Sequence, residues 1–238
     1  MTQPFRGGAT VYRSPLWPEL DILYAPDRIL IGADRSYRTL GNAPFRGGCG
    51  DGRRFVNWKV PLDYDCSDPE KAMRERLTEW GYDVDSTVGL QTAAHLTHAS
   101  FEEEAGDAFR LLVCATAGTG NAARAGLGRE TFSAYAPGTV NVIVLIDGRL
   151  TDAAMANAIV SATEAKCAAF ADLDVRDRDY ADRVATGTTT DAVLIAVSRS
   201  DAYAQIHRYA GAATTLGNAI GRLVYRTVSE AAGTQGEP

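Results

Sequence analysis

The chain has 238 residues, of which 45% are hydrophobic and 23% are charged, and its formal net charge is −6. This length and composition are typical of a globular protein with one large domain or two small ones, and the acidic balance with scattered basic residues argues against nucleic-acid binding. The sequence contains neither an apolar run near the roughly 18 residues of a membrane span nor an N-terminal signal-peptide pattern. We therefore expect a cytoplasmic protein with no nucleic-acid partner and no membrane partner.

The first half of the chain is expected to form short strands and turns, followed by a helix. Apolar or alternating segments separated by prolines predict strands, and the glycine-rich stretch NAPFRGGCGDG predicts a loop. Asp68 suits an N-cap, Pro69 suits the first turn of a helix, and Gly81 suits the position after a helix ends. These signals predict strands over 10–13, 20–25, 27–33 and 54–62, a loop over 42–52 and a helix over 68–81.

The second half of the chain alternates long apolar segments with helical patterns. It predicts strands over 109–118, 139–147 and 191–198, helices over 151–173 (N-capped by Thr151) and 214–232, and a disordered tail over 233–238. Such alternation is typical of an α/β protein whose sheet is covered by helices. Because no linker-like boundary is evident, we expect one domain over 1–238 with a mixed β-sheet, and the strand order stays open.

A lysine interrupts the apolar face of the long helix predicted over 151–173. That face is formed at helical spacing by Met155, Ile159, Ala162, Phe170 and Leu173. Lys166 falls in the middle of this face, and Glu164 lies on roughly the opposite side. A lysine in such a place either extends to the rim of the protein or is buried and paired, which would make it a candidate site residue.

Three polar turns stand at the ends of the predicted strands. The first, TAGTGNAARAG, offers Thr119 and Asn121, and the second places Asn141 in an apolar strand, where a buried amide needs partners. The third, ATGTTTD, has four threonines before Asp191. Their hydroxyls either bind a ligand rich in amides or hydroxyls, or stabilise a tight turn. The first and third turns can meet only if their strands run antiparallel or a crossover folds back.

The cysteines and histidines give weak signals for a metal. Cys49, Cys66, Cys114 and Cys167 are far apart and form no C-x-x-C pair, which predicts reduced thiols and no zinc cluster. His95 and His98 could form half of a metal site or be two partly exposed polar residues. Because the sequence shows no third ligand near them, we expect neither a metal nor a cofactor.

Several motifs, in order, resemble those of the adenosylcobinamide amidohydrolases. They are TAGTGNAARAG, the segment from GTVNVIVLIDGRLTD to AAFADLDV, ATGTTTDAVLIA and YAGAATTLGNAIGRLV, and NAPFRGG and FVNWKVP are similar to the N-terminal half of that family. The resemblance spans roughly residues 40–230 and is weaker over 1–40. It implies hydrolysis of the amide that joins aminopropanol to the corrin side chain, with a small-molecule corrinoid as the partner. Neutral hydroxyl and amide groups suit a ligand that carries many carboxamides.

The resemblance also implies the site residues. Carried onto this sequence, the catalytic candidates are Lys166, Glu164 and Asp191. The carried-over substrate-binding candidates are Asn121, Asn141, Thr186 and Thr188, and we add Thr119 and Asn42 to them. If Glu164 faces away from Lys166, the role of the base passes to Asp191.

This chain departs from the family pattern at three positions, with Thr189 for a glycine, Ala213 for a histidine and Asn218 for a glutamate. An imidazole and a carboxylate are groups that a hydrolase uses as acid and base. Two alternatives to amide hydrolysis in corrinoid salvage therefore remain. The first is a diverged paralogue in natural-product biosynthesis that uses the same pocket for other amide, lactam or ring chemistry. The second is a non-hydrolytic corrinoid-binding protein. Gly217 and Gly221, four residues apart on the last helix, would also allow close packing against another element of the chain or against another subunit of a homo-oligomer.

Overall fold

The computed structural model describes residues 2–61, 64, 67–129 and 139–237. Its strands are β1 (Val11–Tyr12), β2 (Asp21–Ala25), β3 (Arg28–Gly41), β4 (Gly48–Lys59), β5 (Thr87–Thr92), β6 (Ser100–Gly106), β7 (Phe109–Ala117), β8 (Ala122–Ala123), β9 (Val140–Asp147), β10 (Gly187–Thr188) and β11 (Ala192–Val197). Its helices are α1 (Pro69–Glu79), α2 (Asp152–Asp172) and α3 (Thr215–Gly233), with short 3-10 turns η1 (Pro4–Gly7) and η2 (Leu96–His98).

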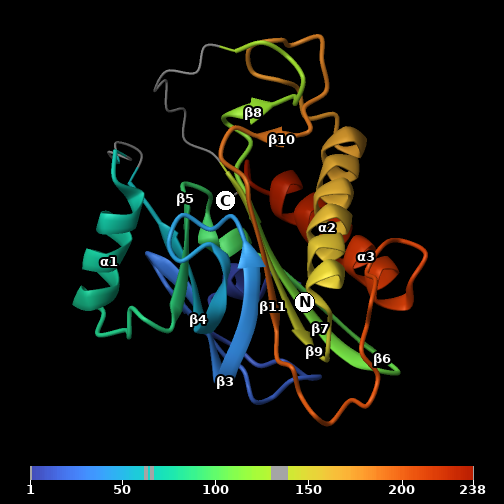
Figure 1. Ribbon diagram of the computed structural model, residues 1–238. Coiled ribbons are helices and arrows are strands. Elements are labelled where there is room, and N and C mark those ends of the chain that lie inside the picture. Colours follow the sequence, from blue (N-terminus) through green and yellow to red (C-terminus); the bar gives the residue numbers. More distant parts are fainter. Residues whose placement is uncertain (1, 62–63, 65–66, 130–138, 238) are drawn as a thin grey trace.

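A mixed sheet organises the described part of the chain (Figure 1). Its strands follow the order β1-β2-β3-β11-β9-β7-β6, and β4 pairs with β3 and carries β5 on its other side. Strand β11 runs parallel to β9 and antiparallel to β3, while β7 runs antiparallel to β9. The sheet curls into a half-barrel with helices outside it, so the prediction of an α/β protein with a mixed, helix-covered sheet is confirmed.

The central strands are apolar because both of their faces are covered. Every residue of β9 is buried. Val140, Val142 and Val144 belong to the core under α2 and α3, whereas Ile143 and Leu145 belong to the core inside the curl. Since side chains alternate between faces along a strand, this arrangement explains a continuous apolar run without alternation.

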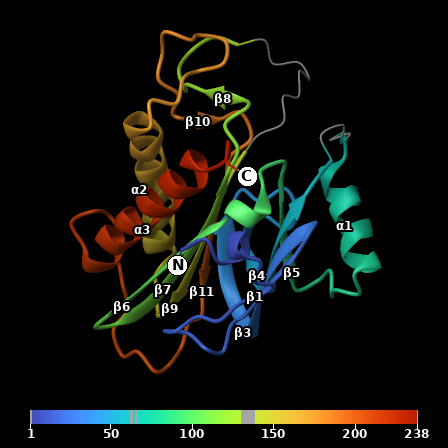
Figure 2. The ribbon, with the colours of Figure 1, turned by 180° about the vertical axis from the view of Figure 1, so that it is seen from behind.

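Helices α2 and α3 pack together over one face of the sheet (Figure 2). The predicted cap of α2 is confirmed, since the Thr151 hydroxyl accepts a hydrogen bond from the Ala154 N–H. Within the predicted apolar face of α2, Met155 and Phe170 are buried. Leu173 is 39% exposed, so its assignment to the core was wrong. Leu173 is the C-cap residue of α2. The helix and its buried apolar face end at this position, so the side chain reaches solvent.

Helix α1 covers the outer side of β4 and β5 and makes a third, smaller core. Met73 and Leu77 of this helix pack with Val56 and Trp58 of β4. The predicted cap Asp68 accepts a hydrogen bond from the Lys71 N–H, as expected for the start of this helix. Aromatic rings and arginines extend this small core to the surface.

The predictions for 42–52 and for the segment between α1 and β7 were wrong or incomplete. Gly48–Gly52 belong to β4 because each pairs with a residue of β3, from Gly41 down to Tyr37. A partner strand therefore overrides the low strand propensity of glycine. Strands β5 and β6 were not predicted. They lie at the edges of the sheet, where polar residues such as those in SFEEEAG interrupt the apolar pattern.

The C-terminal segment, for which we expected disorder, packs against the N-terminus over its described residues. The Gln3 amide donates to Thr234 Oγ1 at 2.8 Å, and Gln235 Oε1 accepts from the His95 N–H at 2.9 Å. Arg6 and Glu237 form an ion pair at 2.6 Å. Disorder was wrong for 233–237 because Gln3, His95 and Arg6, from distant segments, bond to polar groups of this tail.

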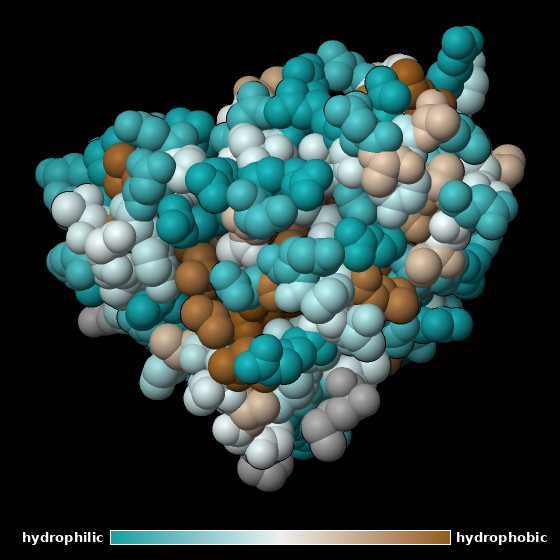
Figure 3. Space-filling model, turned by 90° about the horizontal axis from the view of Figure 1, so that it is seen from below, coloured by the Kyte–Doolittle hydropathy of each residue, from teal (hydrophilic) through white to brown (hydrophobic). Residues whose placement is uncertain are grey.

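The lower end of the molecule carries apolar side chains among polar ones (Figure 3). Val11 and Leu23, register partners on β1 and β2, are 43% and 40% exposed. The helices of the described residues include none with the length and apolar character needed to span a bilayer.

Candidate active site

Antiparallel pairing brings two of the predicted polar turns together at one end of the sheet. Because β7 runs antiparallel to β9 and β11, its C-terminal end lies at the edge where β9 and β11 begin. Strands β8 and β10 then pair above this edge, with Ala123 opposite Gly187. The Asn121 amide donates to Thr189 Oγ1 at 2.8 Å. The first and third polar turns therefore meet, because the strands that carry them run antiparallel.

A buried ion pair between Lys166 and Asp191 lies beneath these turns. The two side chains are only 8% and 13% exposed. Asp191 Oδ2 also accepts from the Thr188 N–H at 3.0 Å, and Oδ1 accepts from the Thr188 hydroxyl at 2.5 Å and the Val140 N–H at 3.1 Å. Four donors fill the acceptor sites of one carboxylate. The carboxylate is therefore held in one position by two groups of Thr188 in its own turn, by the start of β9 and by α2.

Gly187 is packed against this ion pair, which the sequence analysis did not recognise. A methyl group added at Gly187 would overlap Asp191 Oδ2 and Lys166 Nζ. One residue earlier, the Thr186 carbonyl accepts from Cys167 Sγ at 3.0 Å, which ties the turn to α2 next to Lys166. The signal available in the sequence was a glycine between threonines, directly before a strand.

The ion pair opens on a cavity of about 320 Å³ between α2 and the edge of the sheet. Its walls include Leu40, Ile159 and Val193, which are apolar, and Thr163. Of the polar residues in this lining, Lys166 is buried and Asn42 is exposed. The cavity therefore combines apolar walls with a buried charged pair.

Asn42 holds the backbone on both sides of Ala192, directly after Asp191. Its amide nitrogen donates to the Asp191 carbonyl at 2.8 Å, and its Oδ1 accepts from the Val193 N–H at 2.8 Å. The Asn42 side chain thus extends the pairing of β3 with β11 by one step. We expected Asn42 to bind substrate, and the structure gives both of its polar atoms a positioning role.

Asp177 anchors the loops that carry the polar turns. Its carboxylate is fully buried and accepts from the N–H groups of Arg124, Asp179 and Tyr180 at 2.6, 2.8 and 3.0 Å. It also pairs with the Arg129 guanidinium. Burial by itself would raise the pKa of Asp177, but the three backbone donors and Arg129 outweigh it and hold the pKa below its ordinary value.

Comparison with known proteins agrees with the motifs. A family model described as adenosylcobinamide amidohydrolase matches residues 19–238. The adenosylcobinamide amidohydrolase of Methanosarcina mazei is 30% identical over 189 residues, which are 77% of this chain and 84% of that protein. An uncharacterised protein of Methanocaldococcus jannaschii is 32% identical over 172 residues, 65% of this chain and 66% of that protein, slightly less than two thirds of its length.

The chain belongs to the adenosylcobinamide amidohydrolase family. This confirms the resemblance predicted from the motifs. The family match also begins earlier and ends later than the 40–230 expected from them.

Of the candidates, Thr188 bonds to Asp191 of the ion pair, while Thr186 lies in the same turn and Thr119 and Asn121 lie in the neighbouring one. The Thr186 hydroxyl accepts from the Ala125 N–H at 2.9 Å, which fits the turn-stabilising alternative. Thr119 is partly exposed, and its carbonyl accepts from the Ala122 N–H. Asn121 Oδ1 is buried and lacks a partner among the described residues, so it is an acceptor that a ligand or water can satisfy.

Asn141 does not converge with this group. Its amide donates to Asn57 Oδ1 at 2.8 Å and to the Gln91 carbonyl at 2.9 Å, inside the curl of the sheet. Asn57 in turn donates to Thr116 Oγ1 at 2.8 Å. Asp191 instead caps the N–H of Val140, one residue before Asn141. Because successive residues of β9 face opposite sides of the sheet, the expectation that Asn141 lines the same cavity was wrong.

Glu164 also lies away from the ion pair, on another face of α2. It is exposed and lines a separate cavity of about 460 Å³ between α2 and α3. Asn218 lines that same cavity, and Ala213 is exposed just before α3 begins. Neither Ala213 nor Asn218 therefore lines the Lys166–Asp191 cavity. A helix places residues two apart on different faces, so Glu164 and Lys166 cannot act together.

His95 and His98 lie in a different region, at η2. Their ring centroids are 5.6 Å apart. His98 is buried, and burial is the main reason that its pKa lies below the ordinary histidine value. The part of the chain that the structure describes contains no group of three metal-ligating side chains.

Proposed function

We propose that this protein hydrolyses the amide between aminopropanol and the corrin side chain of adenosylcobinamide, giving adenosylcobyric acid. The observation that carries the proposal is the buried Lys166–Asp191 pair in the lining of an otherwise largely apolar cavity. Family membership supplies the substrate class. A charged donor shielded from water is much more effective at a developing oxyanion than the same donor in bulk solvent.

Lys166 is the residue suited to bind the amide oxygen. An ammonium group has three N–H donors, and one of them goes to Asp191. The other donors can stabilise the negative charge that forms on the carbonyl oxygen when water attacks the carbon. When the C–N bond breaks, Lys166 can also supply the proton that the leaving amine requires.

Asp191 is the residue suited to accept the proton of the attacking water. Its Oδ1 is bonded by the Thr188 hydroxyl, which is a rotatable donor, and by the fixed Val140 N–H. Rotation of the Thr188 hydroxyl frees one lone pair for water. The water proton then passes to Asp191, its oxygen bonds to the carbonyl carbon, and the products are a carboxylic acid and free aminopropanol.

The saturated hydrogen bonding of Asp191 favours a second candidate function, which is non-hydrolytic binding of a corrinoid. In that case the ion pair is structural and the cavity holds an uncleaved side chain. The experiment is incubation with adenosylcobinamide, followed by chromatography of the corrinoid and detection of aminopropanol. Binding without product would favour the second function.

Variants then test the assignment of residues. We expect Lys166→Met and Asp191→Asn each to lower kcat/KM by at least 100-fold, within the range that removal of a charge-stabilising donor or a general base produces. Glu164→Gln is the matched control, because Glu164 is exposed on another face of the same helix, and it should keep full activity. Full activity in both Lys166 and Asp191 variants would refute the mechanism.

A further inference from the structure

One polar side chain in the lining of the Lys166–Asp191 cavity has no hydrogen-bond partner among the described residues. The polar residues of this lining are Asn42, Thr163, Lys166 and Asp191. Asn42 Oδ1 accepts from a backbone N–H, both oxygens of Asp191 accept hydrogen bonds, and Lys166 pairs with Asp191. The Thr163 hydroxyl forms no hydrogen bond with any described residue. It is therefore the polar group of this cavity that is left for a ligand.

Thr163 differs in this respect from two other helical threonines of the fold. Thr78 in α1 and Thr227 in α3 each donate to the carbonyl oxygen four residues earlier, at 2.8 Å. This bond to the preceding turn is a common way to satisfy a threonine hydroxyl inside a helix. Because Thr163 does not form it, its hydroxyl stays available both as a donor and as an acceptor.

Helix α2 places Thr163 on the same face as the charged pair. Ile159, Thr163 and Lys166 follow one another at spacings of four and three residues, and all three line the cavity. Residues at these spacings are neighbours on a helix surface, about 5–6 Å apart at Cβ. Leu40 and Val193 contribute apolar walls. A small ligand whose carbonyl oxygen binds Lys166 therefore reaches Thr163 within a few atoms, between apolar walls.

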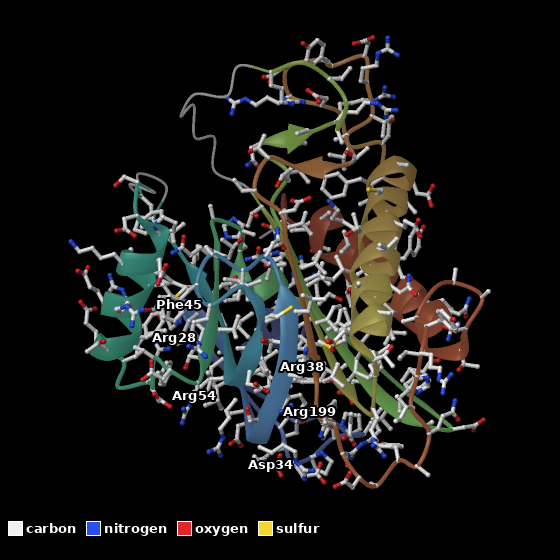
Figure 4. The ribbon with its side chains drawn as sticks, viewed as in Figure 1. Arg28, Asp34, Arg38, Phe45, Arg54 and Arg199 are labelled. Carbon is white, nitrogen blue, oxygen red and sulfur yellow. The ribbon has the colours of Figure 1, made fainter. Side chains whose placement is uncertain are left out.

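The charges around the cavity are already paired. Of the described residues that line it, only Lys166 and Asp191 are charged, and they bond to each other. Figure 4 shows Arg38 on the side of β3 that faces α2, where it forms an ion pair with Asp152 at 3.0 Å. A charged group of a ligand would thus lack a free counter-charge here. A neutral hydroxyl suits the unused hydroxyl of Thr163.

We propose that Thr163 is a specificity-determining residue that recognises the hydroxyl on the amine part of the substrate. This inference rests on the proposed function. In an amide of aminopropanol, only the nitrogen and a short carbon chain separate the carbonyl from the hydroxyl. A carbonyl bound at Lys166 therefore brings the hydroxyl to the neighbouring turn of α2, where it bonds to Thr163, while Ile159 contacts the carbons. The protein should discriminate amides of amino alcohols from amides of plain alkylamines.

Two substrates that differ only in the hydroxyl measure this recognition. They are adenosylcobinamide and its analogue with propylamine in place of aminopropanol. We expect kcat/KM to be about 5-fold higher for adenosylcobinamide, which corresponds to roughly one net hydrogen bond. Thr163→Val keeps the shape of the side chain and removes its hydroxyl, so it should reduce this preference to less than about 2-fold by slowing adenosylcobinamide cleavage. Thr163→Ser keeps a hydroxyl and should retain the preference.

Thr78→Val is the matched control, because Thr78 is exposed on α1 and its hydroxyl bonds within its own helix. It should change neither rate. Circular dichroism checks that each variant is folded, and the preference is a ratio measured on one sample, so partial unfolding does not alter it.

An equal loss of both activities in Thr163→Val would indicate a structural role and overturn the inference. An unmodified protein without the preference, or a Thr163→Ser variant that loses it, would overturn the inference as well. A protein that cleaves neither amide would refute the proposed function and this inference with it.

Discussion

Replacing Gly187 with alanine should disable the site through one methyl group. The backbone at Gly187 lies outside the left-handed region that only glycine favours, so alanine is compatible with the local conformation. The added Cβ, however, would overlap Asp191 Oδ2 and Lys166 Nζ, which already contact each other. The ion pair must therefore separate or the β10 turn must move away from α2.

The expected magnitude follows from that displacement. A shift of catalytic groups by about 1 Å can cost about 100-fold in rate, which corresponds to about 2.7 kcal/mol in activation free energy. Forcing an extra methyl group into a packed site typically destabilises a protein by about 1–3 kcal/mol. We therefore expect Gly187→Ala to lower kcat/KM about 100-fold while the protein stays folded at 25 °C.

The assay is steady-state cleavage of adenosylcobinamide, with urea denaturation to measure the free energy of unfolding. Gly221→Ala is the matched control. A methyl group at Gly221 meets nothing within 4 Å, and alanine in a helix is favoured over glycine by up to about 1 kcal/mol. The control should therefore be active and at least as stable as the original protein. Full activity in Gly187→Ala would refute the assignment of catalysis to the ion pair beneath it.

Three further substitutions test other parts of the structure. Asn42→Ala removes the hydrogen bonds that hold the backbone around Asp191, so kcat should fall about 10-fold, or about 1.4 kcal/mol, with KM nearly unchanged; an increase in KM alone would instead indicate direct substrate binding. Asn141→Leu leaves Asn57 Oδ1 without its donor, which should cost about 1–3 kcal/mol of stability in urea denaturation, with unchanged turnover of the folded enzyme. The pKa of Asp177 is below its ordinary value in the folded chain, because backbone donors and an arginine outweigh burial. The charged carboxylate therefore stabilises the folded state at pH values above the unfolded pKa of about 3.9. This stabilisation is lost as the pH falls through the folded pKa. Asp177→Asn should therefore be less stable at neutral pH and lose less stability on acidification, as measured by denaturation midpoints across pH 2–7; an unchanged acid profile would contradict this.

The sequence determined the elements with strong local signals. The capped helices α1 and α2 and the apolar runs of β7, β9 and β11 were predicted because capping, periodicity and burial act over a few residues. The same periodicity placed Lys166 on the buried face of α2, and the structure confirms that it is 6% exposed. Motif order was also sufficient to predict the family.

Only the tertiary structure decided which polar groups meet. Asn141 and Asp191 are both at strand starts, yet the alternation of side chains sends Asn141 into the curl of the sheet and leaves Asp191 beside Lys166. The strand direction of β7 brought Asn121 to the threonine turn, and helix geometry removed Glu164 from the site. Strand order, strand direction and facing depend on contacts between residues far apart in the chain, which local sequence patterns do not encode.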